Sequence, residues 1–223
     1  MFGAKFKSDG GIFVKICGIT NELDAFAAIE AGADALGFNL VPQSKRYIDI
    51  ERMASWIVKL PREICKVAVV TDPNWEDACR VGQLQFIDAL QLHGNESPEF
   101  CRRLADAGIS FAKAVPVTGL KSLADLPNYF TDTMILDSTV GGAFGGTGKP
   151  FPWKFAPEFV RHHPRIGVIL AGGLNPENVA KAVTLVRPRG VDVTSGVEAS
   201  PGRKDRRRVK AFIEAARSVS GKA

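Results

Sequence analysis

Two residues of this 223-residue chain are candidates for proton transfer, and each lies at the end of a short strand-like segment. Cys17 follows the segment VKI, and Asp137 follows the segment MIL. A thiolate can remove a proton from carbon, and a carboxylic acid that burial keeps protonated can donate one. Each residue also has a structural interpretation, since a free cysteine is often a small buried hydrophobe and an aspartate after a strand often caps a turn. The pair is therefore a candidate general base and general acid.

Two glycine clusters in the last third of the chain are candidates for binding phosphate. Gly172 and Gly173 precede a helix start near Asn175, and Ser195 is followed by Gly196. Glycine lets backbone N–H groups come close to an anion, and the first turn of a helix attracts negative charge. A simple turn at each cluster is the alternative.

A third glycine-rich segment, residues 138–152, resembles a nucleotide-binding loop only in part. Lys149 follows Gly148, but Ala143 stands five positions before that glycine and Pro150 follows the lysine. The Walker pattern therefore fails, and we reject nucleotide binding there. We expect instead either a lid that closes over a substrate or an ordinary flexible loop.

Other polar side chains could surround a ligand. Arg46, in the loop segment QSKR, could hold a carboxylate through two parallel hydrogen bonds, or it could be an exposed basic residue. His93 follows a strand-like run, whereas the only other histidines, His162 and His163, lie at an expected helix end. A histidine-rich metal site cannot be assembled from these positions, and we expect no metal.

The elements that must position these residues are eight short apolar runs with β character, separated by longer helical patterns. This alternation is typical of repeated strand–helix units in a parallel sheet. It predicts an α/β fold, a single-domain (β/α)8 TIM barrel over residues 1–223, with residues 1–11 as a short N-terminal extension. Strand count alone leaves an open doubly wound sheet as the alternative. The predicted strands are Ile12–Cys17, Ala35–Leu40, Lys66–Thr71, Ala89–His93, Ser110–Val115, Thr133–Asp137, Gly167–Ala171 and Gly190–Ser195.

Capping residues mark several of the expected helices. The helix Asn21–Ala31 begins with a capping side chain, and another begins at Asn175–Glu177, where proline takes the first helical position. The last helix, Lys204–Val219, is amphipathic. Its inward residues are Val209, Phe212, Ile213 and Ala216.

In a closed barrel, the carboxyl ends of all strands meet at one mouth. Alternation along the first strand points Lys15 and Cys17 inward, and closure makes the first and last strands neighbours. Asp192 could then pair with Lys15 beneath the site or contact a substrate itself. Because an ordinary thiol is mostly protonated at neutral pH, Lys15 is also a candidate to stabilise a thiolate at Cys17. The residues at or just beyond predicted strand ends are Cys17, Asn39, His93, Asp137, Gly172 and Ser195.

Composition limits the kinds of partner. The net charge is +5 and the isoelectric point is near 9.1, which suits an anionic metabolite but is too modest to indicate nucleic acid. The four cysteines include no Cys-x-x-Cys pair, so neither a zinc site nor a disulfide framework is indicated. No run of about 18 apolar residues occurs, and we expect a soluble, cytoplasmic protein without membrane contact.

With these residues in place, the chain resembles phosphoribosylanthranilate isomerase of tryptophan biosynthesis from Val14 to Phe212. Departures from the family pattern are Val41, where an aromatic residue is common, Pro150 after Lys149, and about ten residues before the first strand. The resemblance rests on the segments KICGIT from Lys15, AGADALGF from Ala31, SKRY from Ser44, QLHG from Gln91, LDS from Leu136, GGTGK from Gly145, AGGL from Ala171 and SGVE from Ser195.

The resemblance implies an Amadori rearrangement of N-(5-phosphoribosyl)anthranilate to 1-(2-carboxyphenylamino)-1-deoxyribulose 5-phosphate. It assigns Cys17 as general base and Asp137 as general acid, without metal or cofactor. Arg46 would hold the anthranilate carboxylate. The implied partner is this small-molecule substrate, and the protein is expected to be a monomer or a homodimer. The other implied contacts are His93 and Asp192 for the substrate and Gly172, Gly173, Ser195 and Gly196 for its phosphate.

Other functions on the same barrel stay open at this point, because phosphate loops do not identify a substrate. A metal-dependent epimerase would need several histidines and acids at strand ends, and an isomerase of the histidine pathway is expected to have aspartate in place of Cys17. An indole-forming synthase would need a strand-end lysine, for which Lys113 is available. A catalytically dead barrel that binds a phosphorylated ligand is the alternative from another class.

Overall fold

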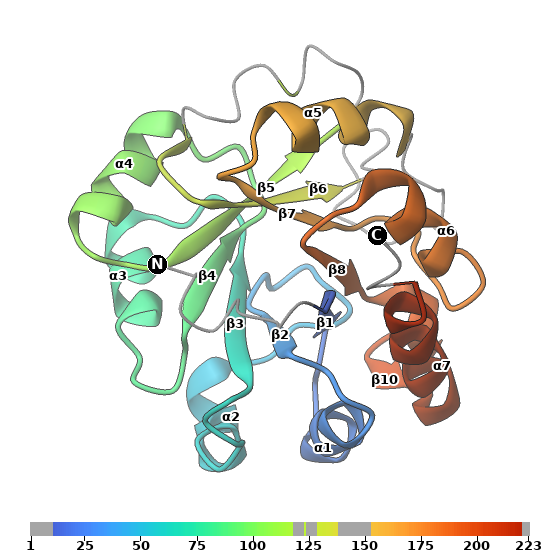
Figure 1. Ribbon diagram of the computed structural model, residues 1–223. Helices are drawn as coiled ribbons and strands as arrows, with labels where there is room; N and C mark the ends of the chain where they lie inside the picture. Colours follow the sequence, from blue (N-terminus) through green and yellow to red (C-terminus); the bar gives the residue numbers. More distant parts are fainter. Residues whose placement is uncertain (1–10, 118–122, 124–128, 138–152, 220–223) are drawn as a thin grey trace.

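All eight predicted strands are present, each within two residues of its predicted bounds. The computed structural model describes residues 11–117, 123, 129–137 and 153–219. The strands pair in parallel in chain order, and β8 returns to β1, so the barrel is closed and the open sheet is excluded (Figure 1). They are β1 (Phe13–Cys17), β2 (Ala35–Asn39), β3 (Cys65–Val70), β4 (Ala89–Leu92), β5 (Phe111–Pro116), β6 (Thr133–Asp137), β7 (Gly167–Leu170) and β8 (Gly190–Val193).

Alternating side chains along the strands build two separate cores. Mostly small residues fill the barrel interior, as Ala35, Val67 and Ala112 do. Their neighbours, such as Leu36 and Leu90, face outward and pack with the helices. A strand that is buried on both faces consists mainly of apolar residues, so it appears in the sequence as an apolar run. This is why the strands could be predicted.

Within the described residues, seven α-helices surround the barrel (Figure 1). The predicted cap at Asn21 is confirmed, because its side chain accepts a hydrogen bond from the Asp24 amide at 2.9 Å. Asn175 instead forms a turn, accepting from the amides of Glu177 and Asn178, and the regular helix begins only at Val179. The helices are α1 (Glu22–Glu30), α2 (Ile50–Ile57), α3 (Trp75–Gly82), α4 (Pro98–Asp106), α5 (Ala156–His162), α6 (Val179–Val186) and α7 (Arg206–Arg217).

The last helix starts two residues later than predicted. Asp205 caps it by accepting from the amides of Arg207 and Arg208, so Lys204 lies outside the helix. Lys204 belongs to a short antiparallel hairpin, β9 (Glu198–Ser200) and β10 (Arg203–Lys204), that sequence reasoning missed. The predicted inward residues Val209, Phe212, Ile213 and Ala216 are all buried.

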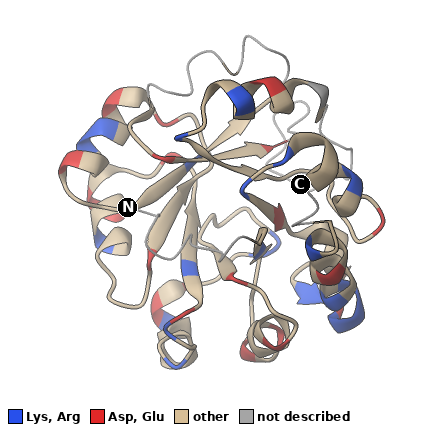
Figure 2. Ribbon diagram, viewed as in Figure 1, with Lys and Arg blue, Asp and Glu red and all other residues tan. Residues whose placement is uncertain are grey.

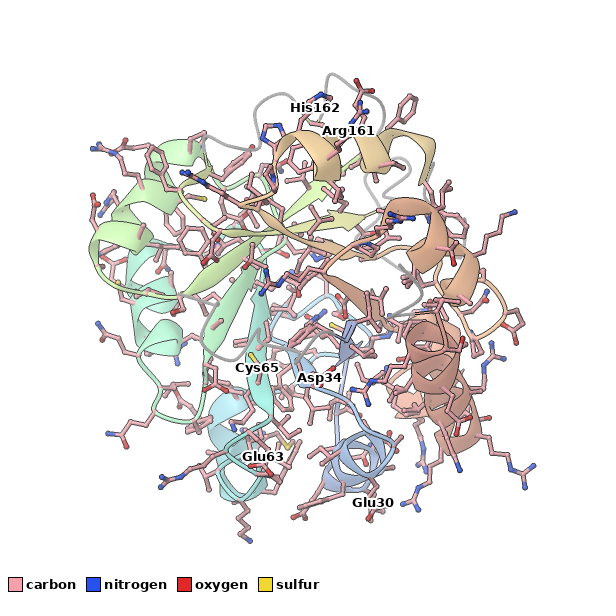
Figure 3. All side chains as sticks on the ribbon, in the orientation of Figure 1. Glu30, Asp34, Glu63, Cys65, Arg161 and His162 are labelled. Atoms are coloured by element: carbon pink, nitrogen blue, oxygen red, sulfur yellow. The ribbon has the colours of Figure 1, made fainter. Side chains whose placement is uncertain are left out.

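Asp34 connects three elements at the amino-terminal end of the barrel. It lies directly before β2 and is labelled in Figure 3. Its carboxylate accepts from the Val14 amide at 2.7 Å and pairs with Arg217 at 3.1 Å. Asp34 thus connects β1, the start of β2 and α7 at the end of the barrel opposite to the carboxyl ends of the strands.

Charged residues lie mainly on the outer helices, and several basic residues lie near the start of α7 (Figure 2). Arg206, Arg207 and Arg208 are exposed there. No helix in the described part of the chain is long and apolar enough to cross a membrane. The expected lid, residues 138–152, and all but Gly11 of the expected extension lie outside the described residues.

Candidate active site

One cavity of about 680 Å³ opens at the carboxyl ends of the strands. It brings together every residue that the sequence analysis assigned to catalysis, substrate or phosphate, although they come from six separate segments. The barrel explains this convergence, because all its strands end at the same mouth. The predicted residues that line it are Cys17, Arg46, His93, Asp137, Gly172, Gly173, Asp192, Ser195 and Gly196.

Cys17 ends β1 and is 7% exposed, with Gly37 of β2 directly beside it. A Cβ atom at Gly37 would lie 2.7 Å from the Cys17 Sγ and 3.0 Å from the Lys15 Nζ. The thiol and the ammonium group therefore share the space that this glycine leaves free. The inward direction predicted for both side chains is confirmed.

Lys15 is completely buried, and its Nζ donates to the Asp192 Oδ2 at 2.9 Å. The predicted pair beneath the site is thus present, with the two residues in register on β1 and β8. Burial alone would lower the pKa of Lys15, but the charges of Asp192 and Cys17 and their hydrogen bonds outweigh it, so the pKa is raised. Lys15 therefore keeps a positive charge next to the thiol.

Asp137 ends β6, is 8% exposed and lies against His93, the residue that follows β4. The His93 Nε2 is 3.3 Å from the Asp137 Oδ2, and the His93 Nδ1 is 3.0 Å from the Gln91 Nε2. Around the barrel, β7 and β8 separate β6 from β1. The candidate acid and the candidate base thus approach the cavity from different sides.

Two acceptor atoms at the cavity are buried without a partner among the described residues. They are the Gln91 Oε1 and the Asp192 Oδ1. A buried acceptor without a hydrogen bond is costly, so these atoms are suited to take hydroxyl donors from a ligand. Gln91 was missed by the sequence analysis, although its position two residues before His93 places both side chains on one face of β4.

The two glycine clusters lie side by side. Gly172 and Gly173 have φ values of +79° and +65°, which favour glycine, and no described residue accepts a hydrogen bond from either amide. A Cβ atom at Gly196 would collide with the Leu174 carbonyl, so the second cluster contacts the first. Arg208 donates to the Gly196 carbonyl at 3.0 Å. Unpaired backbone N–H groups beside a basic surface suit a phosphate.

Arg46 is not an exposed basic residue, because its side chain is only 16% exposed. Its Nε and Nη2 donate to the two carboxylate oxygens of Glu198 at 2.8 and 2.6 Å. Sequence reasoning did not assign Glu198, and no periodic pattern pointed to it. The guanidinium group therefore already makes two parallel hydrogen bonds to a carboxylate, and this carboxylate belongs to the protein. The sequence predicts the same geometry for a carboxylate of a ligand.

Three features bear on the alternative functions. Lys113 faces away from the barrel interior and pairs with Glu96 at 2.9 Å, so it cannot serve as a catalytic lysine at the mouth. His162 lies on α5 at the outer surface (Figure 3). In the described residues no three His, Cys, Asp or Glu side chains form a group that could hold a metal ion.

Comparisons with a family model and with curated proteins identify the same family. The sequence pattern of the family described as N-(5'phosphoribosyl)anthranilate (PRA) isomerase matches residues 14–215. The N-(5'-phosphoribosyl)anthranilate isomerase of Geobacter sp. (strain M21) is 44% identical over 207 residues, which cover 93% of this chain and 98% of the relative.

Solved structures agree with this match. A crystal structure of phosphoribosyl anthranilate isomerase from Thermotoga maritima has a TM-score of 0.85 and 41% identity, and covers 93% of this chain and 99% of that one. A crystal structure of such an isomerase in complex with reduced 1-(o-carboxyphenylamino)-1-deoxyribulose 5-phosphate has a TM-score of 0.80 and 39% identity, with the same coverage.

Proposed function

The chain belongs to the N-(5'-phosphoribosyl)anthranilate isomerase family, and from this premise we propose that Cys17 is its general base and Asp137 its general acid. The enzyme is an isomerase of tryptophan biosynthesis. Its proposed reaction is the Amadori rearrangement of N-(5-phosphoribosyl)anthranilate to 1-(2-carboxyphenylamino)-1-deoxyribulose 5-phosphate. The observation that carries the assignment is that both side chains line one cavity, together with unpaired backbone amides suited to phosphate.

In the first step, protonated Asp137 donates its proton to the ring oxygen of the ribose. The bond between that oxygen and C1′ breaks, and the nitrogen lone pair forms the C1′=N bond of an iminium ion. His93 is the neighbour of Asp137 at 3.3 Å, so we assign it to orienting this carboxyl group and contacting the opened sugar. General acid catalysis suits a carboxyl group that is buried at the edge of a cavity.

In the second step, the Cys17 thiolate removes the proton from C2′. The electrons of that C–H bond form the C1′=C2′ double bond and neutralise the iminium nitrogen, which gives an enolamine. The enolamine tautomerises to the ketone. No electrons are gained or lost overall, so the two proton-transferring side chains suffice for this scheme. Lys15, next to the thiol, is proposed to favour the thiolate by its positive charge.

The remaining cavity residues are proposed to hold the substrate. The unpaired Asp192 Oδ1 accepts a sugar hydroxyl, and Arg46 takes the anthranilate carboxylate. The phosphate is bound by backbone amides of the two glycine clusters. Anchoring at both ends of the substrate fixes the reacting carbons between acid and base, which is worth several orders of magnitude in rate. The phosphate-binding residues are Gly172, Gly173, Ser195 and Gly196.

The test follows the loss of anthranilate fluorescence as purified protein converts the substrate. Cys17→Ala and Asp137→Asn should each lower kcat by roughly 10²- to 10⁴-fold, because each removes one proton-transfer group. Cys101→Ala is a matched control, since this thiol lies on the buried face of α4 and does not line the cavity. Absence of turnover by the unaltered protein, or full activity of both site variants, would contradict the proposal.

A further inference from the structure

We propose that Glu198 and Lys204 are positioning residues that aim the Arg46 guanidinium at the substrate carboxylate and so set the preference for a carboxylated aromatic amine. The inference rests on the proposed function, in which Arg46 holds that carboxylate. Neither Glu198 nor Lys204 is assigned a proton transfer in that reaction.

The three side chains form a buried chain of ion pairs. Glu198 accepts from Arg46 through both oxygens, at 2.8 and 2.6 Å, and from the Lys204 Nζ at 3.0 Å. The side chains of Glu198 and Lys204 are only 4% and 1% exposed. Exposed ion pairs contribute little to stability, but these pairs are buried. Buried, charge-assisted hydrogen bonds of this kind fix the orientation of the side chains that make them.

The geometry at Arg46 leaves one side of its guanidinium group available. Glu198 occupies the edge formed by Nε and Nη2, and the described residues make no other hydrogen bond to this side chain. Because a guanidinium group has five N–H donors in a fixed plane, the edge formed by Nη1 and Nη2 can still bind a second carboxylate. Glu198 is therefore a support for Arg46 and need not compete with the substrate.

The charges of the three groups favour an anionic ligand. Two cations and one anion leave one net positive charge on this cluster, of which Arg46 and Glu198 line the cavity. Burial alone would raise the pKa of Glu198, but the hydrogen bonds and charges of Arg46 and Lys204 outweigh it, so this pKa lies below its ordinary value. Without Lys204, the Arg46–Glu198 pair would be neutral and would attract a substrate carboxylate less.

The hairpin that follows β8 positions Glu198 and Lys204 next to Arg46. Glu198 and Lys204 are cross-strand partners in β9 and β10. The hairpin turn is attached to the first strand–helix loop, because the Thr20 hydroxyl donates to the Gly202 carbonyl at 2.6 Å. Arg46 comes from the loop after β2, so segments 152 residues apart in the sequence meet at this guanidinium.

The test compares two ligands that differ only in the carboxylate. They are reduced 1-(o-carboxyphenylamino)-1-deoxyribulose 5-phosphate and its counterpart with an unsubstituted phenyl ring. Calorimetry gives the dissociation constant of each for the unaltered protein and for Glu198→Gln, Lys204→Met and Arg46→Gln. The readout is the ratio of the two constants, since a variant that is partly unfolded weakens both ligands alike. Glu214→Gln and Lys210→Met, which alter an exposed ion pair on α7, are the matched controls.

We expect the unaltered protein to prefer the carboxylated ligand, and this preference to fall about tenfold or more in Glu198→Gln, Lys204→Met and Arg46→Gln. The control variants should keep it. Glu198→Gln in an Arg46→Gln background should cause no further fall, because Glu198 acts through Arg46.

Three outcomes would overturn the inference. A parallel weakening of both ligands in the Glu198 and Lys204 variants would show a structural role only. A rise of the preference in Glu198→Gln would show that this carboxylate competes with the ligand. A preference unchanged in Arg46→Gln would show that the carboxylate binds elsewhere. Absence of turnover by the unaltered protein, with its preference for the carboxylated ligand intact, would instead contradict the proposed reaction, so the two failures are distinguishable.

Discussion

At the residue scale, the surroundings of Cys17 are set by two neighbouring residues, Gly37 and Lys15. Gly37 leaves the space in which its Sγ lies, and Lys15 supplies a buried positive charge beside it. Asp192 holds this lysine in place from the neighbouring strand. A base at this position thus depends on the packing of β1 between β2 and β8, and each neighbour can be tested separately.

Gly37→Ala should disturb the catalytic thiol more than the fold. The added methyl group would lie 2.7 Å from the Cys17 Sγ, so the sulfur must shift. Overpacking of this kind costs about 1–3 kcal/mol of stability, whereas a displaced catalytic atom can lower the rate about 100-fold. Urea unfolding and the fluorescence assay measure the two effects. Turnover equal to that of the unaltered protein would mean that the thiol position does not matter.

Removal of the charge at Lys15 should lower the reactivity of the thiol. Because Lys15→Met alone leaves Asp192 buried without its partner, the cleaner variant is Lys15→Met with Asp192→Asn. We expect slower alkylation of Cys17 by iodoacetamide at neutral pH and slower turnover. Asp192→Asn alone is the control, since it keeps the lysine. Unchanged alkylation and turnover in the double variant would show that Lys15 does not favour the thiolate.

At the scale of elements, the short hairpin of β9 and β10 matters more than its five residues suggest. It supplies Glu198, which pairs with Arg46, and Lys204, which pairs with Glu198, and it is followed by Asp205, which caps α7. The loops after β7 and β8 supply the phosphate contacts in the proposed function. In the proposed function, the segment after β8 therefore contributes to binding both the phosphate and the carboxylate of the substrate.

Glu198 should make the stability of the protein depend on pH in the acid range. Its pKa in the folded protein lies below the ordinary value, so its contribution is complete above about pH 4.3 and is lost as the pH falls through the lowered folded value. Glu198→Gln should therefore show a shallower loss of unfolding free energy between about pH 5 and pH 3. Urea titrations at several pH values measure this slope. A slope equal to that of the unaltered protein, or one changed as much in Glu214→Gln, would contradict the expectation.

At the scale of the whole molecule, the barrel and many of the residues at its mouth could be predicted from the sequence. Strands buried on both faces appear as apolar runs, and residues that follow such runs must meet when the barrel closes. Cys17, His93 and Asp137 were found in this way. The pair of Lys15 and Asp192 followed from closure alone, because the first and last strands become neighbours.

Other features could not be predicted from local patterns. Arg46 and Glu198 are 152 residues apart, and Glu198 lies in a three-residue strand without periodicity. The start of α6 was predicted too early, because an asparagine that forms a turn has the same signature as one that caps a helix. Which ring nitrogen of His93 faces Asp137 is equally a matter of three-dimensional packing.

The central claim is that Cys17 and Asp137 approach the reacting carbons from different sides. The most direct measurement is a crystal structure of this protein with reduced 1-(o-carboxyphenylamino)-1-deoxyribulose 5-phosphate. The account predicts the Cys17 Sγ within about 3.5 Å of C2′ and the Asp137 carboxyl group within hydrogen-bond reach of the oxygen released from the ring. A ligand bound with C2′ turned away from Cys17, or with both side chains on one side of the sugar, would contradict it.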